Sequence, residues 1–440
     1  MTHEPSTDEL RPGSSGRVRI RDLAHGGAGV GNAEGDTRDG IVWFVEGALP
    51  GELVEAVVDH RAKKFLRAHA TQVIEPAAIR VSPACPYADL CGGCAWQHVA
   101  CGAQAELKRD IVRAQLRAIE IPEIDVIGSP QPLGYRRRAR VHYEKHGTEL
   151  RLGFRGRRSR SIANMAACAV LEPALDRAVQ RVRAMTDLLP SSGAVHGITD
   201  GVRVLLGLPA VPVNAETLAA AEALLDDTLV GVELRGGRQR HVVGKPALDI
   251  DAGDGRRGLT VGPFGFAQAQ AAQNAALVRH VARQVGSGGE GLELFAGAGN
   301  LTRVLGRAFK SLECVEHERE AVEQLRRLKK RDSLPLHVLR SKADVAVRRF
   351  AERKRKFRVS VLDPPRGGLG EEGTRDLCRV TTQGLVYVSC DPATLARDLR
   401  VATASGFRVS GVTVFDFMPM TPEVEIVVAL ERPPRGTTRP

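Results

Sequence analysis

The stretch Leu292–Thr302, LELFAGAGNLT, decides the fold of the C-terminal part of the chain. A short apolar strand runs into the turn AGAGN, where glycine lets the backbone approach a ligand closely, and a helix follows from Leu301. Glu316 lies nineteen residues beyond Gly297, the usual place for a carboxylate that binds ribose hydroxyls. The pattern predicts a nucleoside cofactor. Thr302 replaces the third glycine of a dinucleotide fingerprint, so S-adenosylmethionine fits better than a nicotinamide.

Outward from this turn, helices alternate with short apolar runs from Val261 onward, which predicts a parallel sheet. A helix is expected over residues 267–285. Ligands of such sheets sit beyond the carboxyl ends of the strands. We therefore expect the residues at those ends to converge, namely Gly297, Glu316, Asp363 and Cys390.

Two of these strand ends carry reactive groups. Asp363 opens DPPRGG, where the prolines either hold a rigid loop at the site or merely end the strand. Cys390, in SCDPATLARDL, precedes a helix whose N-terminus is expected to lower the thiol pKa, which makes it a candidate nucleophile. Glu425 comes just before the apolar strand EIVVAL, and it is either a base with a raised pKa or a solvated residue at a strand start.

The cysteines favour metal chemistry over disulfides, since the chain has eight of them and its start lacks the apolar core of an export signal. Cys85, Cys91 and Cys94 lie in CPYADLCGGC, and Cys168 or Cys101 could complete the site. Zinc and an iron–sulfur cluster both remain open, because spacing alone does not choose between them. Burial explains the isolated Cys314 and Cys378 better.

Length and charge limit the remaining possibilities. The chain has 440 residues, 43% of them apolar, which predicts about three domains and not a disordered protein. No apolar run is long enough for a membrane span. The net charge is +11, and residues 134–160 carry nine Arg and Lys145 against two Glu. That excess indicates either a polyanion-binding surface or a solvated basic face. Short glycine-broken strands over residues 16–76 predict a small β-barrel.

Six segments together resemble a known family: CPYADLCGGCAWQH, YRRRARVHY, LELFAGAGNLT, DPPRGG, SCDPATLARDL and PMTPEVE. In this order they are similar to the RNA uracil-C5 methyltransferases that carry an N-terminal TRAM domain. The resemblance implies an α/β protein of three parts. These are an OB-like TRAM β-barrel that binds RNA (10–76), a mixed α/β central domain with a [4Fe–4S] cluster and the basic RNA-binding stretch (77–260), and a Rossmann-like class I methyltransferase domain (261–434).

The same resemblance implies roles for individual residues. Cys390 would be the nucleophile and Glu425 the base. The cluster ligands would be Cys85, Cys91, Cys94 and Cys168, and the cofactor and uracil would be bound by Gln268, Phe295, Gly297, Asn300, Glu316, Asp344 and Asp363. Two positions depart from the family pattern: Gln270 stands where asparagine is usual, and Glu423 where histidine is common.

The function implied is methylation of carbon 5 of a uridine by S-adenosylmethionine, through a covalent bond between Cys390 and carbon 6. The resemblance favours 23S ribosomal RNA over transfer RNA. A catalytically lapsed RNA-binding or assembly factor is the alternative from another class. A 5-methylcytidine enzyme with two cysteines is disfavoured, because only Cys390 lies at a strand end. We expect a cytoplasmic monomer with no DNA or membrane partner.

Overall fold

The N-terminal strands close into a barrel, as the short strands broken by glycine predict. The computed structural model describes residues 10–34, 41–157 and 159–433, so Arg158 of the basic stretch and residue 434 of the expected catalytic domain lie outside it. Val18 and Ile20 point inward from one strand and pack on Trp43. The barrel order is β1-β2-β3-β5-β4, with β1 (Ser15–Leu23), β2 (Gly29–Ala33), β3 (Val42–Glu46), β4 (Leu53–Arg61) and β5 (Phe65–Glu75).

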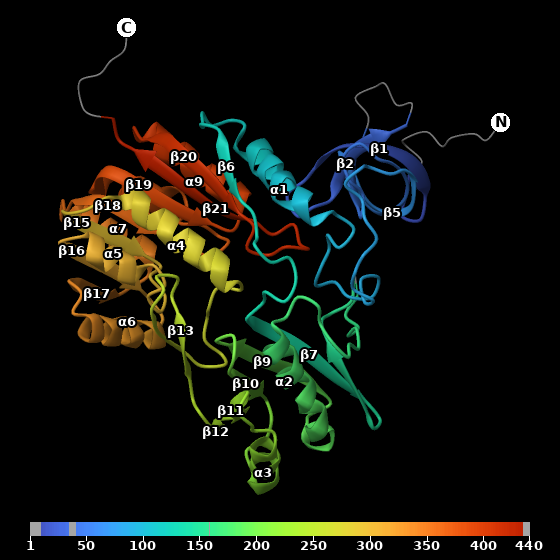
Figure 1. The fold of residues 1–440 in the computed structure, drawn as a ribbon. Helices are drawn as coiled ribbons and strands as arrows, with labels where there is room; N and C mark the ends of the chain where they lie inside the picture. Colours follow the sequence, from blue (N-terminus) through green and yellow to red (C-terminus); the bar gives the residue numbers. More distant parts are fainter. Residues whose placement is uncertain (1–9, 35–40, 158, 434–440) are drawn as a thin grey trace.

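The middle of the chain forms a six-stranded sheet covered by helices on one face (Figure 1). Its order is β12-β11-β10-β9-β7-β8, with β7 (Arg138–His146), β8 (Glu149–Gly153), β9 (Ser192–Thr199), β10 (Val204–Pro209), β11 (Leu229–Gly236) and β12 (Gln239–Gly244). The covering elements are α2 (Pro173–Arg181), the 3-10 helix η1 (Val182–Leu188) and α3 (Ala215–Ala223). A separate hairpin, β13 (Leu248–Asp251) with β14 (Arg257–Val261), leads out of this part.

The C-terminal part is an eight-stranded, mostly parallel sheet of order β17-β16-β15-β18-β19-β21-β20-β6. Its strands from this region are β15 (Glu290–Leu294), β16 (Ser311–Glu316), β17 (Leu336–Arg340), β18 (Phe357–Leu362), β19 (Thr381–Ser389), β20 (Arg408–Phe415) and β21 (Glu425–Glu431). Apolar clusters fill both faces, which explains the continuous apolar runs in these strands. One face packs on α4 (Ala271–Val285), α5 (Thr302–Ala308) and α6 (Arg319–Asp332), and the other on α7 (Ala343–Glu352), α8 (Glu371–Val380) and α9 (Pro392–Ala404).

Two elements from the segment before residue 260 join this C-terminal sheet. The sequence predicts that they belong to the central domain, but β6 (Ile124–Ile127) pairs with β20. The helix α1 (Cys101–Leu116) buries Val112 and Leu116 in the same core as α9. The chain therefore crosses to the C-terminal sheet and returns, which an amphipathic pattern cannot reveal. The other expected domain limits stay predictions.

The helix expected over residues 267–285 begins later, at Ala271. The backbone just before it is extended because it pairs with the segment ahead of β7: the Arg137 N–H donates to the Ala269 carbonyl, and Arg136 forms a bridge with Gln270. Gln268 therefore lies ahead of the helix, outside any helix or strand. In the described residues no helix has the length and apolar character that a membrane crossing needs.

A buried ion pair fastens α1 to the loop between β20 and β21. The Lys108 ammonium donates to Asp416 at 2.5 Å and to the Met418 carbonyl at 3.0 Å, and both charged side chains are almost fully buried. Removing one partner leaves the other charge buried and uncompensated, which is more costly than replacing both with apolar groups.

We expect Lys108→Ala to lower the free energy of unfolding by about 3–5 kcal/mol. Urea titration followed by tryptophan fluorescence measures this. The double variant Lys108→Met with Asp416→Leu should recover most of the loss. A double variant no more stable than Lys108→Ala would contradict the account.

Candidate active site

The strand register sets Cys390 opposite Glu425. β19 and β21 are antiparallel, and Ser389 pairs with Ile426, so the next pair along the two strands is Cys390 and Glu425. β18 lies on the other side of β19 with Leu362 beside Tyr387, which brings Asp363 to the same edge. The structure therefore gathers the predicted nucleophile, the predicted base and the predicted ligand at one point of the sheet.

The carboxyl groups of this site have raised pKa values, because burial disfavours their charged form. Burial raises the pKa of Glu425 well above its usual range, and the charges of Asp363 and Glu423 raise it further. Burial raises the pKa of Asp363 to about 6. The sequence left open whether Glu425 is a solvated strand-start residue, and its half-buried position with a raised pKa favours a tuned acid–base group.

The expected low pKa of the Cys390 thiol is wrong for the free protein. Burial raises this pKa to about 11, and Glu425 and Asp363 raise it as well, while Arg366 and a hydrogen bond with the backbone of Cys390 lower it. The helix α9 does not offset this, because Asp391 caps it: its side chain accepts hydrogen bonds from the Ala393 and Thr394 amides at 3.0 and 2.9 Å. The free N–H groups that would stabilise a thiolate are thus already engaged.

A rigid loop carries Asp363. The Leu369 N–H donates to buried Asp398 at 2.9 Å, and the Tyr387 hydroxyl donates to the same carboxylate at 2.7 Å. The Thr394 hydroxyl donates to the Arg366 carbonyl at 2.9 Å. Because the loop backbone is tied at several points, the prolines of DPPRGG hold a fixed loop and do not merely end β18.

The turn after β15 is built as the sequence predicts. Glu316 accepts a hydrogen bond from the Gly297 N–H at 2.9 Å. It also accepts hydrogen bonds from the backbone N–H groups of the two residues that follow Glu316 in the chain. Phe295 has a left-handed φ of 59°. A Cβ on Gly297 would meet no protein atom within 4 Å, so this side of the turn faces open space where a ligand can approach.

The other predicted cofactor residues are placed differently. The side-chain amides of Asn300 and Asn274 exchange two hydrogen bonds of 2.9 Å, which fixes Asn300 beside the turn. Asp344 is exposed in the first turn of α7, beyond β17. Gln268 is half-buried, and its carbonyl accepts a hydrogen bond from the Arg137 guanidinium at 2.8 Å. The role of each residue remains a prediction.

Three features of this site were not predicted from the sequence. Glu293 is buried inside β15, and burial raises its pKa to about 8. An acid within the apolar run LELF was the available signal. His25 of the barrel lies 3.6 Å from Asp391, and Arg366 pairs with Glu423 at 2.5 Å. These pairs join distant segments, so no local pattern indicates them.

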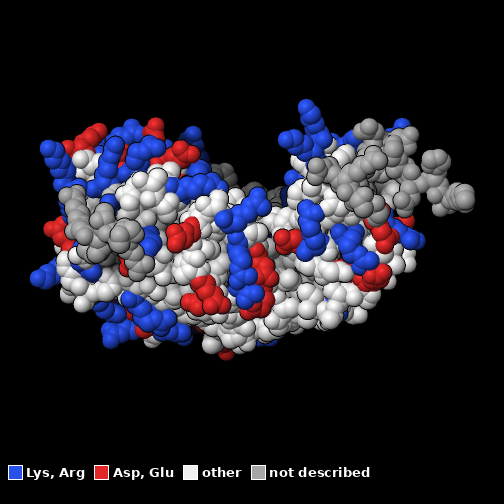
Figure 2. Space-filling model, turned by 90° about the horizontal axis from the view of Figure 1, so that it is seen from above, with Lys and Arg blue, Asp and Glu red and all other residues white. Residues whose placement is uncertain are grey.

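The barrel reaches the active site through the loop that carries His25. Gly27 in this loop has φ +84°, and a Cβ there would lie 2.6 Å from Trp96 and 2.7 Å from Pro422. Only glycine allows this close approach. Figure 2 shows a notch between the lobe of the C-terminal sheet and the lobe of the barrel, with Lys and Arg on both.

Only part of the basic stretch faces solvent. Arg137 is buried on the Gln268 carbonyl, and the Arg138 guanidinium donates to the Gly265 carbonyl while it lies 5.6 Å from the exposed ring of Phe266. Arg140 is exposed. The charge run therefore combines structural arginines with a smaller exposed surface.

The four predicted cluster ligands come together around one cavity. Cys85, Cys91, Cys94 and Cys168 line it, among the apolar side chains of Ala88, Phe154, Met165 and Val170. Cys101 is exposed and does not line this cavity. In the part of the chain that the structure describes, no three His, Cys, Asp or Glu side chains are arranged to hold a single metal ion.

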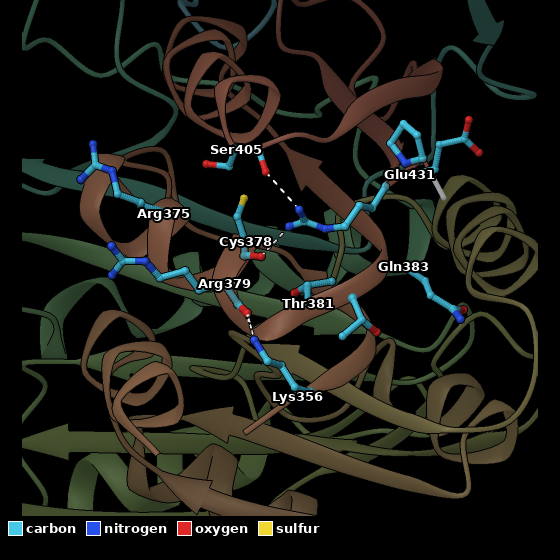
Figure 3. Close-up of a pocket in the computed structure, with 11 residues that line it drawn as sticks. Lys356, Arg375, Cys378, Arg379, Thr381, Gln383, Ser405 and Glu431 are labelled. Atoms are coloured by element: carbon cyan, nitrogen blue, oxygen red, sulfur yellow. Dashed lines mark hydrogen bonds between the residues drawn. The ribbon is translucent and has the colours of Figure 1, made fainter. Parts of the chain in front are cut away.

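A larger cavity of about 870 Å³ lies at the opposite edge of the C-terminal sheet (Figure 3). It contains none of the predicted site residues. Its Arg432 donates to the Ser405 and Cys378 carbonyls at 3.1 and 2.7 Å, and Lys356 donates to the Arg379 carbonyl at 2.7 Å. Since these cations already satisfy backbone groups, we interpret them as structural.

Comparison with known proteins agrees with this geometry. The family described as tRNA (Uracil-5-)-methyltransferase matches residues 263–433, and the TRAM domain matches residues 9–71. The chain is 35% identical to the 23S rRNA (uracil(1939)-C(5))-methyltransferase RlmD of Halomonas elongata, over 98% of this chain and 92% of the relative. RlmD of Chromohalobacter salexigens is 34% identical over 95% and 90%.

A solved structure shares the whole fold. It is the tRNA (uracil-54, C5)-methyltransferase of Pyrococcus abyssi in complex with S-adenosyl-L-homocysteine. The TM-score is 0.71 at 22% identity, and the match covers 94% of this chain and 99% of the other.

The raised pKa of Cys390 predicts slow alkylation of the free protein. With a pKa of about 11, about one thiol in a thousand is ionised at pH 8. We expect the rate of Cys390 carbamidomethylation by iodoacetamide, read by peptide mass spectrometry, to rise about tenfold per pH unit between pH 7 and 9.5. Exposed Cys101 serves as the internal reference. A rate for Cys390 that does not change over this range would contradict the assignment.

Proposed function

Because the chain belongs to the family of RNA uracil-C5 methyltransferases that carry a TRAM domain, we propose that it methylates carbon 5 of a uridine in 23S ribosomal RNA. The relatives named above support the ribosomal substrate. The observation that carries the proposal is the register that sets Cys390 against Glu425 with Asp363 beside them. A ribosomal RNA substrate would place the protein in the cytoplasm.

Carbon 5 of uracil is a weak nucleophile, so its electron density has to be raised first. The Cys390 sulfur adds to carbon 6, and the electron pair of the 5,6 double bond moves into an enolate. When bound, S-adenosylmethionine would supply an electrophilic methyl group to carbon 5 and leave as S-adenosylhomocysteine. The Glu425 carboxylate then takes the carbon 5 proton, the bond from carbon 6 to sulfur breaks, and Cys390 leaves as thiolate.

Two protonation states have to change before this sequence runs. In the free protein the Cys390 thiol keeps its proton and burial favours the neutral form of Glu425, so each group has to release its proton to solvent before the sulfur adds to carbon 6. Arg366 is the cation that favours the thiolate of Cys390. A flipped uracil that fills the pocket would bring Cys390 its reaction partner, and base flipping is needed because a stacked base hides carbon 6.

The cofactor site would use the turn after β15. The open space at Gly297 leaves room for the ligand, Glu316 is held at the end of β16, and Phe295 and Asn300 flank the turn. These groups bind and orient the nucleoside, while Asp363 and Gln268 would lie between it and the uracil. Exposed Asp344 is the weakest member of the proposed set.

Trapping with 5-fluorouridine RNA tests the mechanism. Fluorine at carbon 5 cannot leave as a proton does, so the adduct with Cys390 persists. We expect wild-type protein, S-adenosylmethionine and a fluorinated 23S fragment to give a stable protein–RNA band. Cys390→Ala should abolish it, while Cys101→Ala, which removes an exposed thiol, should keep it. Glu425→Gln should accumulate a methylated adduct on unmodified RNA.

The same assay distinguishes the other hypotheses. A transfer RNA enzyme would form the adduct with fluorinated transfer RNA and not with the 23S fragment. An RNA-binding factor without catalysis would bind RNA and form no adduct with either. Turnover that persists in Cys390→Ala would refute the covalent mechanism.

We also propose that the cavity lined by four thiols holds a [4Fe–4S] cluster. Four cysteine thiols around one cavity, whose lining is apolar apart from Gln97 and Arg136, suit such a cluster, which is larger than a single ion and holds its thiolates farther apart. The Gly93 N–H lies 3.4 Å from the Cys91 sulfur, the kind of contact that supports a ligated thiolate. The methyl transfer moves no net electrons, so the cluster would stabilise the fold or the RNA-binding surface.

We expect anaerobically purified protein to be coloured, with four irons and four sulfides per chain in chemical assays. Cys94→Ala should lose iron and thermal stability, because burial of the remaining thiols without a ligand is unfavourable. The exposed Cys101→Ala keeps both and is the matched control. A colourless protein with one zinc would contradict the cluster.

A further inference from the structure

Arg366 presents a guanidinium from a fixed backbone at the mouth of the active site. Its carbonyl is held by Thr394, the next glycine carbonyl accepts from Arg397 at 2.9 Å, and the Gly368 N–H donates to the Pro365 carbonyl at 2.9 Å. The side chain itself is 68% exposed. The backbone is thus fixed while the charged end is free to exchange partners.

Glu423 is the partner of this guanidinium in the free protein. The two side chains meet at 2.5 Å, and among the described residues Arg366 has no other ion pair. Glu423 is itself 39% exposed and lies two residues before Glu425. The charges of Cys390 and Asp391 also act on Arg366. The pair is therefore open to solvent and close to the nucleophile.

We propose that Arg366 binds a backbone phosphate of the RNA beside the target uridine, and that the Glu423 carboxylate occupies the phosphate position until RNA arrives. This inference rests on the proposed function, since it takes RNA as the substrate. A flipped nucleotide enters the pocket base first, so its phosphates remain at the mouth. The N–H groups of the planar guanidinium donate to a carboxylate or to a phosphate in the same geometry.

Replacement of the Glu423 carboxylate by a phosphate is favoured because the Arg366–Glu423 pair is exposed. Ion pairs on the surface contribute little to stability, because water screens them and two long side chains have to be ordered. When a protein cation neutralises a phosphate, counterions condensed on the RNA are released, and this release favours RNA binding. Glu423 stands where the resembled family commonly has histidine, so this chain carries a competing carboxylate at its own RNA contact.

The proposal and a purely structural role of the ion pair predict opposite effects of one variant on the affinity for RNA. If the pair only fastens two loops, Arg366→Gln and Glu423→Gln should both weaken RNA binding. If Glu423 competes with phosphate, Arg366→Gln weakens binding while Glu423→Gln strengthens it. Glutamine keeps the size of Glu423 and removes its charge, and at position 366 it removes the guanidinium and shortens the side chain.

Fluorescence anisotropy of a labelled 23S fragment with full-length protein, over a series of salt concentrations, tests this. We expect Arg366→Gln to weaken binding about tenfold and to reduce the slope of log K against log salt by about one phosphate contact. Glu423→Gln should bind about threefold more tightly. Arg348→Gln is the matched control. Arg348 is also exposed and lies 3.4 Å from its partner Glu372, and this pair is outside the active site.

An unchanged affinity and slope in Arg366→Gln overturns the proposal, and so does weaker binding in both variants. These outcomes are separate from failure of the proposed function. Wild-type protein that binds the fragment but forms no 5-fluorouridine adduct would refute the methyltransferase mechanism and leave the phosphate contact standing. Wild-type protein that does not bind the fragment overturns both.

Discussion

The antiparallel strand β21 is the constraint on which the site depends. It is inserted between β19 and β20, so its first residue lies at the edge where the parallel strands end. A parallel strand in this place would have put its carboxyl end there and Glu425 at the far edge. The hydrogen-bonded register then leaves little freedom, because a shift by one residue would turn Glu425 to the other face of the sheet.

The electrostatics of the free protein follow from the same arrangement. The half-buried side chains of Asp363, Glu425 and Cys390 share one edge of the sheet, and the charge of Arg366 lowers the pKa of Cys390. Each negative charge raises the pKa of its neighbours, so Glu425 and the Cys390 thiol hold their protons in the free protein. A nucleophile that stays a thiol until substrate arrives is protected from alkylation and oxidation, which attack the thiolate. Substrate binding has to supply the change that ionises it.

The barrel is part of this site and not only an appended domain. Its loop contacts Asp391 through His25 and packs against Trp96 and Pro422 at Gly27. The cap that holds the start of α9 is therefore shared between two segments more than 300 residues apart in the chain. RNA that docks on the barrel would lie beside the nucleophile.

Much of the fold could be predicted from local patterns. The glycine turn at Gly297, the spacing to Glu316 and the apolar strands predict the sheet and its cofactor edge, because these features depend on backbone geometry a few residues long. The position of α1 and β6 could not be predicted, since an amphipathic helix does not state which core it packs on. The late start of α4 depends on pairing with Arg136 and Arg137, and no residue near Ala267 indicates it.

The sequence by itself determined which chemical groups are available: the Cys390 thiol, the Glu425 carboxylate, the glycine turn and the cysteine cluster. Only the tertiary structure decided how those groups behave. The pKa of Cys390 is high and not low because burial and two facing carboxyls outweigh a helix terminus whose amides Asp391 already occupies. The pairing of Arg366 with Glu423 likewise arises from two loops that meet in space. Desolvation and charge interactions depend on distances between distant segments, and a linear sequence does not contain those distances.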